Sequence, residues 1–143
     1  FDVLARFLHM GVDPYSFVSA LNGILAQRLI RVLCPQCSMP TSPSRHLMDE
    51  SGISLESTAG FRFMTGKGCK HCRGTGYRGR KAIDELLVLN DEIREAIVAR
   101  VPVRQLKELA RKSGVRVIRL SALELVRRGE TTIEEVNRVT AMA

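Results

Sequence analysis

Four cysteines are the residues whose type and spacing could carry chemistry in this sequence. They form two Cys-x-x-Cys pairs, Cys34 with Cys37 and Cys69 with Cys72, on either side of residues 38–68. Two residues between thiols is a spacing typical of metal ligands. Zn²⁺ prefers four ligands in a tetrahedron, and four thiolates fill that shell and leave no position for a catalytic water. We therefore expect one structural zinc ion held by all four cysteines.

Other readings of the four thiols are two redox-active pairs or four unrelated cysteines. No signal peptide is visible and no apolar run reaches the roughly 20 residues of a membrane span. The absence of a visible signal peptide favours a reducing compartment, where thiols stay free for metal. His46 and His71 could substitute as ligands. His71 lies inside the second pair, where geometry argues against it, and we expect both histidines to be surface residues.

The segment between the pairs, residues 38–68, contains few large apolar side chains. Such a segment cannot bury enough surface to offset the entropy of ordering it. A structural zinc can supply on the order of 10 kcal/mol at neutral pH. We therefore expect the metal to be the source of order here, with a short helix over 46–50 and a strand over 61–64.

Basic residues are concentrated around the second pair, and no Asp or Glu occurs between Ser57 and Ile83. The formal net charge of the chain is +7. The segment could bind phosphate, nucleic acid or an acidic protein, or it could be a solvated rim around an anionic zinc–thiolate centre. Few aromatic side chains are available for base stacking, which weakens the nucleic-acid reading. The basic residues are Arg62, Lys67, Lys70, Arg73, Arg78, Arg80 and Lys81.

No catalytic pattern is legible in the chain. The glycine-rich stretch 74–79 lacks the GxxxxGK[ST] arrangement of a phosphate-binding loop, and that arrangement occurs nowhere else. No nucleophile has a recognisable partner base. On its own, the chain is therefore not expected to be an enzyme.

The elements that must position the thiols are helices at both ends with strands between them. A helix over 3–8 should stop at Gly11, and Asp13 should cap a second helix begun by Pro14. The second helix should bury one stripe of side chains. Residues 27–33 are compatible with a strand or a longer helix, and 80–89 with a strand. The stripe is Phe17, Val18, Leu21, Ile24 and Leu25.

The last third should be helical. Asn90 or Asp91 caps one helix, and 103–112 and 121–128 form two more, each ended by a glycine. Thr132 and Glu135 have the spacing of a capping box for a final helix. These short helices need packing against each other to be stable.

Three segments together resemble a known family over residues 10–140. They are MGVDPYSFVSALNGILAQRLIRVLCPQC, GCKHCRGTGYRGRKAIDELL and GETTIEEVNRVT. Their order and wording are similar to the C-terminal part of type II secretion ATPases, in the traffic-ATPase family that also drives type IV pilus assembly. TGYRGR and TTIEEVNRVT favour the secretion branch, whereas Ala82 and Asp84 depart from the usual pattern and leave the branch open.

The resemblance implies an α+β fold in three parts. Residues 1–33 would be the C-terminal tail of a RecA-like ATPase domain, to which Gln27, Arg28 and Arg31 would contribute. Residues 34–79 would be a Cys₄ zinc-binding subdomain with short strands. Residues 80–143 would be a C-terminal helical subdomain.

The resemblance also implies a larger parent protein. The parent would be a cytoplasmic homo-hexameric ATPase at the inner membrane face, using ATP and Mg²⁺ to power pseudopilus assembly in type II secretion. Its Walker motifs would lie upstream of Phe1. Its partners would be inner-membrane secretion platform proteins, which would hold it at the membrane peripherally, and no nucleic acid is expected.

Two other functions compete with that reading. A zinc-ribbon-like nucleic-acid-binding module would explain the basic residues between 62 and 81. A client-binding zinc domain of the Hsp40 type would explain CKHCRGTG, which fits one CxxCxGxG unit. Those chaperone domains use several such units, and CPQC lacks the following glycines.

Overall fold

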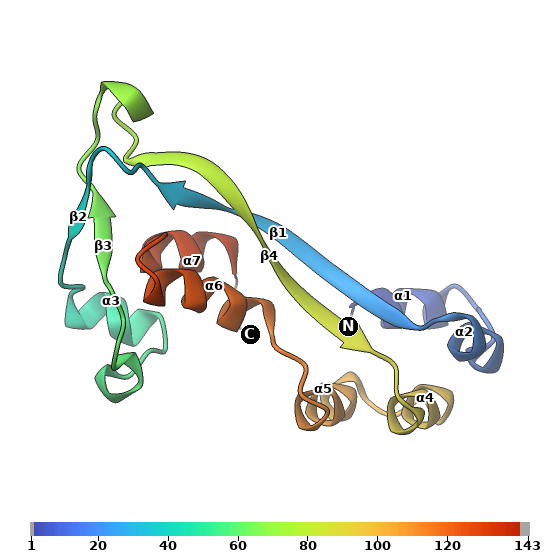
Figure 1. Cartoon of the computed structure of the whole chain (residues 1–143). Helices are drawn as coiled ribbons and strands as arrows, with labels where there is room; N and C mark the ends of the chain where they lie inside the picture. The colour runs from blue at the N-terminus through green and yellow to red at the C-terminus, as the bar shows by residue number, and fades with distance from the viewer. Residues whose placement is uncertain (1, 141–143) are drawn as a thin grey trace. The chain divides into compact units, whose positions relative to one another are not determined.

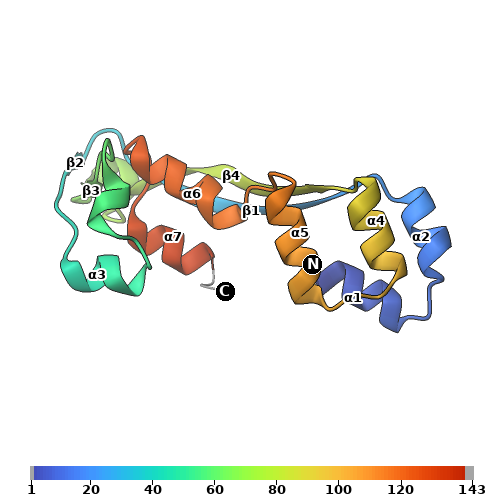
Figure 2. The same cartoon turned by 90° about the horizontal axis from the view of Figure 1, so that it is seen from below.

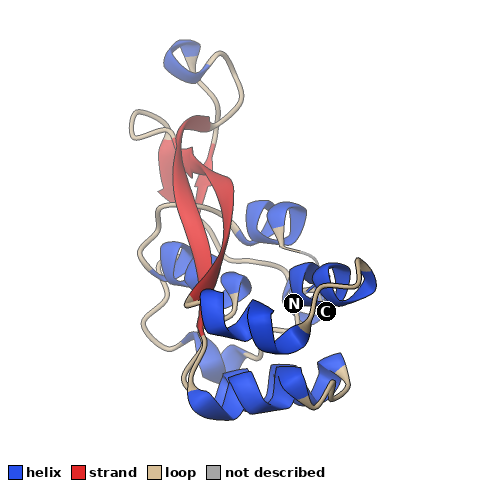
Figure 3. Ribbon diagram, turned by 90° about the vertical axis from the view of Figure 1, so that its right-hand side faces the viewer, coloured by secondary structure: helices blue, strands red, loops and turns tan. Residues whose placement is uncertain are grey.

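The computed structural model describes the backbone of residues 2–140, and their side chains except at positions 2, 4, 5, 8 and 55. The chain divides into two compact units. Unit 1 comprises Phe1–Ala26 with Glu85–Arg116, and unit 2 comprises Gln27–Asp84 with Val117–Ala143. Helices and strands are mixed along the chain (Figure 3), which confirms the α+β class.

The described part of unit 1 contains four helices, which are α1 (Asp2–His9), α2 (Pro14–Ala20), α4 (Asp91–Val98) and α5 (Val103–Lys112). Side-chain caps begin two of them, α2 and α4. The Asp13 carboxylate accepts from the Ser16 N–H at 2.8 Å, and the Asn90 side chain accepts from the Ile93 N–H at 2.9 Å. Aliphatic side chains from α2, α4, α5 and one strand form the core. Its buried members are Val18, Leu87, Leu89, Ile93, Ala96, Ile97, Leu106 and Ala110.

The second helix is shorter than its apolar stripe predicted. It ends at Ala20, and Ile24 and Leu25 belong instead to strand β1 (Gly23–Leu33). Leu25 is 60% exposed, so its predicted burial is wrong. The physical reason is that the spacing of these apolar residues also fits a strand. A hydrogen bond from the Leu89 N–H to the Asn22 carbonyl stabilises the extended backbone where β1 begins.

Two long strands connect the units along the chain. Strand β1 pairs with β4 (Tyr77–Val88) in a two-stranded sheet, and the arrows run in opposite directions in Figure 1. The sequence left 27–33 open between a strand and a longer helix and favoured a strand over 80–89; both segments are strands, and both strands begin earlier. Alternation places Ile30 and Ile83 on a buried face of the sheet in unit 2.

Unit 2 surrounds a second aliphatic core. Strands β2 (Ser38–Pro40) and β3 (Met64–Gly66) pair antiparallel, with Ser38 opposite Gly66. Figure 2 shows this two-stranded sheet beside α3 (Arg45–Glu50), α6 (Ile118–Arg127) and α7 (Ile133–Val139). Short 3₁₀ turns occupy Leu55–Thr58 and Lys70–Cys72. The buried core residues are Ile30, Met48, Ile53, Ile83, Ala122, Val126, Ile133 and Val136.

The segment between the cysteine pairs corrects one expectation. Met48 and Ile53 are buried in the unit 2 core, and Phe61 and Phe63 pack against it. Apolar burial therefore orders much of 38–68, and the metal is not its sole source of order. The few large apolar side chains suffice because the core is completed by α6 and α7, which the local sequence does not reveal.

Among the described residues, no helix has both the length and the apolar character needed to cross a membrane.

Candidate metal centre

Each cysteine pair lies where the chain turns tightly after or before a strand. Cys34 follows β1 directly, and its carbonyl accepts from the N–H groups of Cys37 at 3.2 Å and Ser38 at 2.9 Å. Cys69 precedes the turn Lys70–Cys72, and its carbonyl accepts from the Gly74 N–H at 2.9 Å. Both turns point their two thiols to the same side, as a shared ion requires.

Main-chain hydrogen bonds join the two turns. The Cys34 N–H donates to the Gly76 carbonyl at 2.9 Å, and the Lys67 N–H donates to the Cys37 carbonyl at 3.0 Å. A Cβ at Gly66 would lie 2.3 Å from the Gly76 oxygen, so a side chain is sterically excluded there. Gly76 itself has φ +77°, a conformation that favours glycine. These glycines allow the close approach that brings the sulfurs together.

The four sulfurs converge to within 4.8 Å of one another. The Sγ–Sγ distances are 3.8 Å for Cys34–Cys69, 3.8 Å for Cys37–Cys72 and 3.7 Å for Cys69–Cys72. A tetrahedral zinc with Zn–S bonds of about 2.3 Å has sulfurs about 3.8 Å apart. A disulfide needs about 2.05 Å, so the thiols are free. The geometry fits a four-coordinate metal ion.

The electrostatics of the cluster also suit a cation. Burial raises the pKa of the Cys72 thiol, but the Cys69 and Gly76 N–H groups, each 3.2 Å from the sulfur, outweigh it and lower the pKa to about 6. Burial raises the pKa of the Cys37 thiol to about 12, and the neighbouring sulfurs add to that rise. Four thiolates this close repel one another, and a divalent cation removes the repulsion.

The structure does not bring the two histidines to the sulfurs. The one metal-ligand group among the described residues contains only the four cysteines. The His71 ring contacts the Arg78 guanidinium. The side chain of His46 is 82% exposed and pairs with Glu50. Both histidines are therefore surface residues, as expected.

The basic residues near the second pair are all exposed. Lys81 pairs with Glu130, and Arg78 donates to the His71 carbonyl at 3.2 Å. Their exposure is consistent with a solvated basic rim around the thiol cluster.

Unit 2 also contains an ion-pair cluster that the sequence analysis did not predict. Glu135 is 1% exposed, and its carboxylate accepts from the Arg31 Nη2 and the Arg138 Nη2, each at 2.6 Å. Burial raises the pKa of Glu135, but the N–H groups of both arginines hold it at about 2. The Arg31 guanidinium lies 4.2 Å from the centre of the Tyr77 ring.

The predicted capping box is half formed. The Thr132 hydroxyl accepts from the Glu135 N–H at 3.2 Å, but the Glu135 carboxylate binds the two arginines. Of the three residues assigned to the motor domain, Arg31 is in this cluster, Arg28 donates to the Val139 carbonyl and Gln27 is exposed. The sequence feature that could have indicated the ion-pair cluster is Glu135, an acidic residue in the first turn of the predicted final helix.

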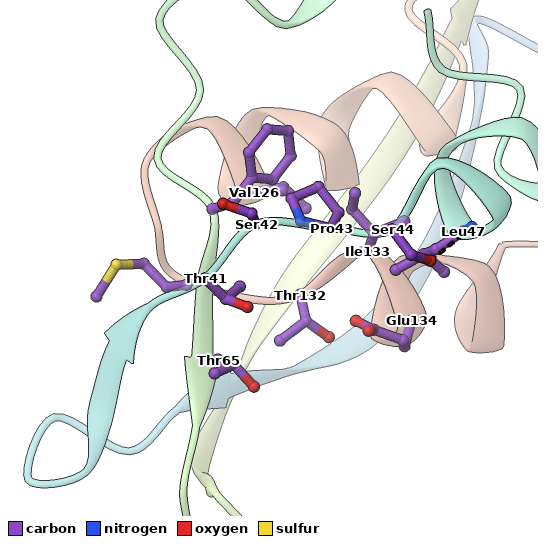
Figure 4. Close-up of a pocket in the computed structure, with 12 residues that line it drawn as sticks. Thr41, Ser42, Pro43, Ser44, Leu47, Thr65, Val126, Thr132, Ile133 and Glu134 are labelled. Carbon is purple, nitrogen blue, oxygen red and sulfur yellow. Dashed lines mark hydrogen bonds between the residues drawn. The ribbon is translucent and has the colours of Figure 1, made fainter. Parts of the chain in front are cut away.

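A small cleft of about 150 Å³ is lined by the loop that leads from β2 into α3, by β3 and by residues of α6 and α7 (Figure 4). Hydroxyl groups and one carboxylate line much of it, and none of its described lining residues is a histidine or a cysteine. The polar lining residues are Thr41, Ser42, Ser44, Thr65, Thr132 and Glu134.

Comparison with known proteins agrees with the resemblance. Residues 1–138 match the family described as Type II/IV secretion system protein. The chain is 43% identical over 135 residues to the type IV pilus assembly ATPase PilB of Thermus thermophilus, covering 94% of this chain and 15% of that protein. It is 40% identical over 137 residues to the type II secretion system protein E of Xanthomonas campestris pv. campestris, covering 96% and 24%.

A third relative is the type II secretion system protein HxcR of Pseudomonas aeruginosa, 36% identical over 139 residues, with 97% of this chain and 26% of that protein covered. The chain thus spans about a quarter or less of the length of these relatives. The family match covers nearly every residue of the chain, including both cysteine pairs. The chain belongs to the type II/IV secretion system protein family.

Proposed function

We propose that Cys34, Cys37, Cys69 and Cys72 bind one structural zinc ion. The convergence of four sulfurs at the spacing of a tetrahedral shell is the observation that carries this proposal. Zinc would crosslink the two turns, and a shell filled by four thiolates leaves no coordination position for a substrate or water. The N–H groups directed at Cys72 would support the thiolate state.

The chain would be the zinc-bearing C-terminal part of a larger ATPase that powers assembly of a pilus-like filament. The names of the relatives, an assembly ATPase and secretion system proteins, support this proposal. The parent would work as a cytoplasmic homo-hexamer at the inner membrane face, contacting secretion platform proteins. It would bind ATP and Mg²⁺ in segments upstream of this chain.

The assignment to pseudopilus assembly in type II secretion stays a prediction. The relatives include proteins of both branches at similar identity. We retain secretion because of the TGYRGR and TTIEEVNRVT segments. The division into a RecA-like tail over 1–33, a zinc subdomain over 34–79 and a helical subdomain over 80–143 is likewise proposed.

The test compares this chain with the parent protein encoded by its whole reading frame. We expect one zinc per chain in both, ATP hydrolysis by the parent and none by residues 1–143. Cys34→Ser should remove the zinc, and His46→Ala, which changes an exposed residue outside the cluster, should not. A reading frame with no Walker A sequence upstream would contradict the motor proposal without touching the zinc proposal.

A further inference from the structure

Three arginines of unit 2 line one open cavity, whose described lining residues include none of the four cysteines. The cavity has a volume of about 380 Å³, and its lining is Leu29, Arg31, Arg80 and Arg138. Strands β1 and β4 contribute Arg31 and Arg80, and helix α7 contributes Arg138. None of the described residues that line the cavity is acidic, so its wall presents guanidinium groups to any molecule that enters.

The charge balance leaves an excess of two positive charges. Arg31 and Arg138 share the single carboxylate of Glu135. Arg80 is exposed, and its side chain forms no hydrogen bond or ion pair with another described residue. Three guanidinium charges against one carboxylate give a net charge of +2 for the group, which is the charge that a dianion would neutralise.

Arg31 is held in place before any ligand arrives. Its Nε and Nη2 donate to Glu135 at 3.0 and 2.6 Å, and its guanidinium stacks on Tyr77 at 4.2 Å. Its carbonyl accepts from the Thr131 hydroxyl at 2.8 Å. Although fixed, the side chain remains 42% exposed. A fixed, accessible guanidinium loses little conformational entropy on binding and keeps its other N–H groups for a ligand.

Arg138 is held in the same way by Glu135, with Nε at 2.7 Å and Nη2 at 2.6 Å, and its side chain is 54% exposed. Glu135 therefore gathers two arginines at one wall and neutralises only one of them. Guanidinium groups match oxyanions in geometry, and a phosphate carries about −1.5 to −2 at neutral pH. A ligand with a single carboxylate would neutralise only half of the excess charge.

We propose that Arg31, Arg80 and Arg138 form a binding site for a phosphate group. The shared chemistry is a tetrahedral dianion, which a free phosphate or the phosphate tail of a nucleotide could supply. Arg31 and Arg138 provide fixed donors, and Arg80 completes the site by moving toward the anion.

The test titrates inorganic phosphate into the zinc-loaded chain, freed of excess metal, by calorimetry. Binding should saturate, weaken as NaCl is added, and fall about tenfold in Arg80→Gln, the effect expected for one charge-assisted hydrogen bond. Arg80 has no partner to lose, so this variant should fold. Arg104→Gln makes the same charge change on a side chain that is 91% exposed in unit 1 and should bind as the unaltered chain does.

A second titrant, ADP without Mg²⁺, identifies the source of the phosphate, and a third, glutamate, tests whether the site prefers phosphate to a carboxylate. Tighter binding of ADP without Mg²⁺, lost in Arg80→Gln, assigns a nucleotide, and equal binding of ADP and phosphate assigns the free anion. Either result supports the proposal. No phosphate binding at millimolar concentration, equal affinity in Arg80→Gln, or equally tight binding of glutamate would overturn it.

Discussion

Units 1 and 2 are ordered by different means. In unit 1 the buried side chains are aliphatic, and side-chain caps begin α2 and α4. Unit 2 has a comparable aliphatic core, but its tip, residues 34–38 and 66–76, lies outside that core. The buried residues of the tip are Cys34, Cys72 and Gly76. Apolar burial thus explains the order of unit 1, whereas we propose that the tip of unit 2 gains comparable order from a metal held by its thiols.

The largest expected effect concerns this tip. Cys72→Ser should abolish zinc binding, whose contribution is on the order of 10 kcal/mol. Amide hydrogen exchange should accelerate across the tip, while the amides of α4 and α5 keep their protection. Metal analysis and residue-resolved exchange measure both outcomes.

The matched control for that variant is His71→Ala, which alters a neighbouring side chain outside the sulfur cluster. It should retain one zinc per chain. Zinc retained at full occupancy in Cys72→Ser would show that the ligand set is wrong.

A core truncation should give the opposite pattern. Ile97 is 1% exposed in unit 1, so Ile97→Ala should lower the free energy of unfolding by about 2–5 kcal/mol. Zinc content should not change. Chemical denaturation followed by circular dichroism measures the loss, and Val103→Ala, at a 38% exposed position, should cost much less. Loss of zinc in Ile97→Ala would contradict the difference between the units.

The buried carboxylate should matter to unit 2 by a smaller amount. Glu135→Gln replaces the ion pairs with Arg31 and Arg138 by weaker hydrogen bonds to an uncharged amide and should cost about 2 kcal/mol at neutral pH. Glu134→Gln, on the exposed neighbour, is the control and should cost little. Urea unfolding of the two variants makes the comparison, and equal stability would contradict the role of Glu135.

The pH dependence of that cost follows from the lowered pKa of Glu135. Its pKa is about 2 in the folded chain and 4.5 when unperturbed. The stabilisation is therefore complete above about pH 4.5 and is lost as the pH falls toward 2. The stability difference between the chain and Glu135→Gln should narrow across that range. A difference that stays constant would mean that the carboxylate charge is not responsible.

The smallest expected effect is at the cap of α4. Asn90→Ala removes the bond to the Ile93 N–H and should cost about 1 kcal/mol in unit 1. Thermal unfolding by circular dichroism measures it. Ser113→Ala leaves the cap in place but removes the second bond of the Asn90 amide and the bond from the Ser113 hydroxyl to the Leu109 carbonyl, and it should cost less. A greater loss in Ser113→Ala than in Asn90→Ala would show that the cap is not the important contact.

The sequence allowed the thiol cluster to be predicted, because ligand spacing is a local property. Cys34 and Cys37 lie in one turn and Cys69 and Cys72 in another, and each pair is recognisable alone. Helix caps such as Asp13 were predictable for the same reason. That the sulfurs converge is a finding of the structure, and metal occupancy stays a prediction.

Contacts between distant parts of the chain were not predictable in this way. Arg31 and Glu135 are 104 positions apart, and no local pattern indicates that they meet. Leu25 was placed in a helix because its spacing from Leu21 fits either kind of element, and pairing with β4 decides the outcome. Burial of Met48 in the core formed with α6 and α7 likewise depends on helices far along the sequence.

X-ray absorption at the zinc edge of the purified chain tests the central claim most directly. We expect one zinc per chain with four sulfur neighbours at about 2.3 Å and no nitrogen or oxygen ligand. A shell containing nitrogen or oxygen, or a well-ordered chain that binds no zinc when zinc is supplied, would contradict it.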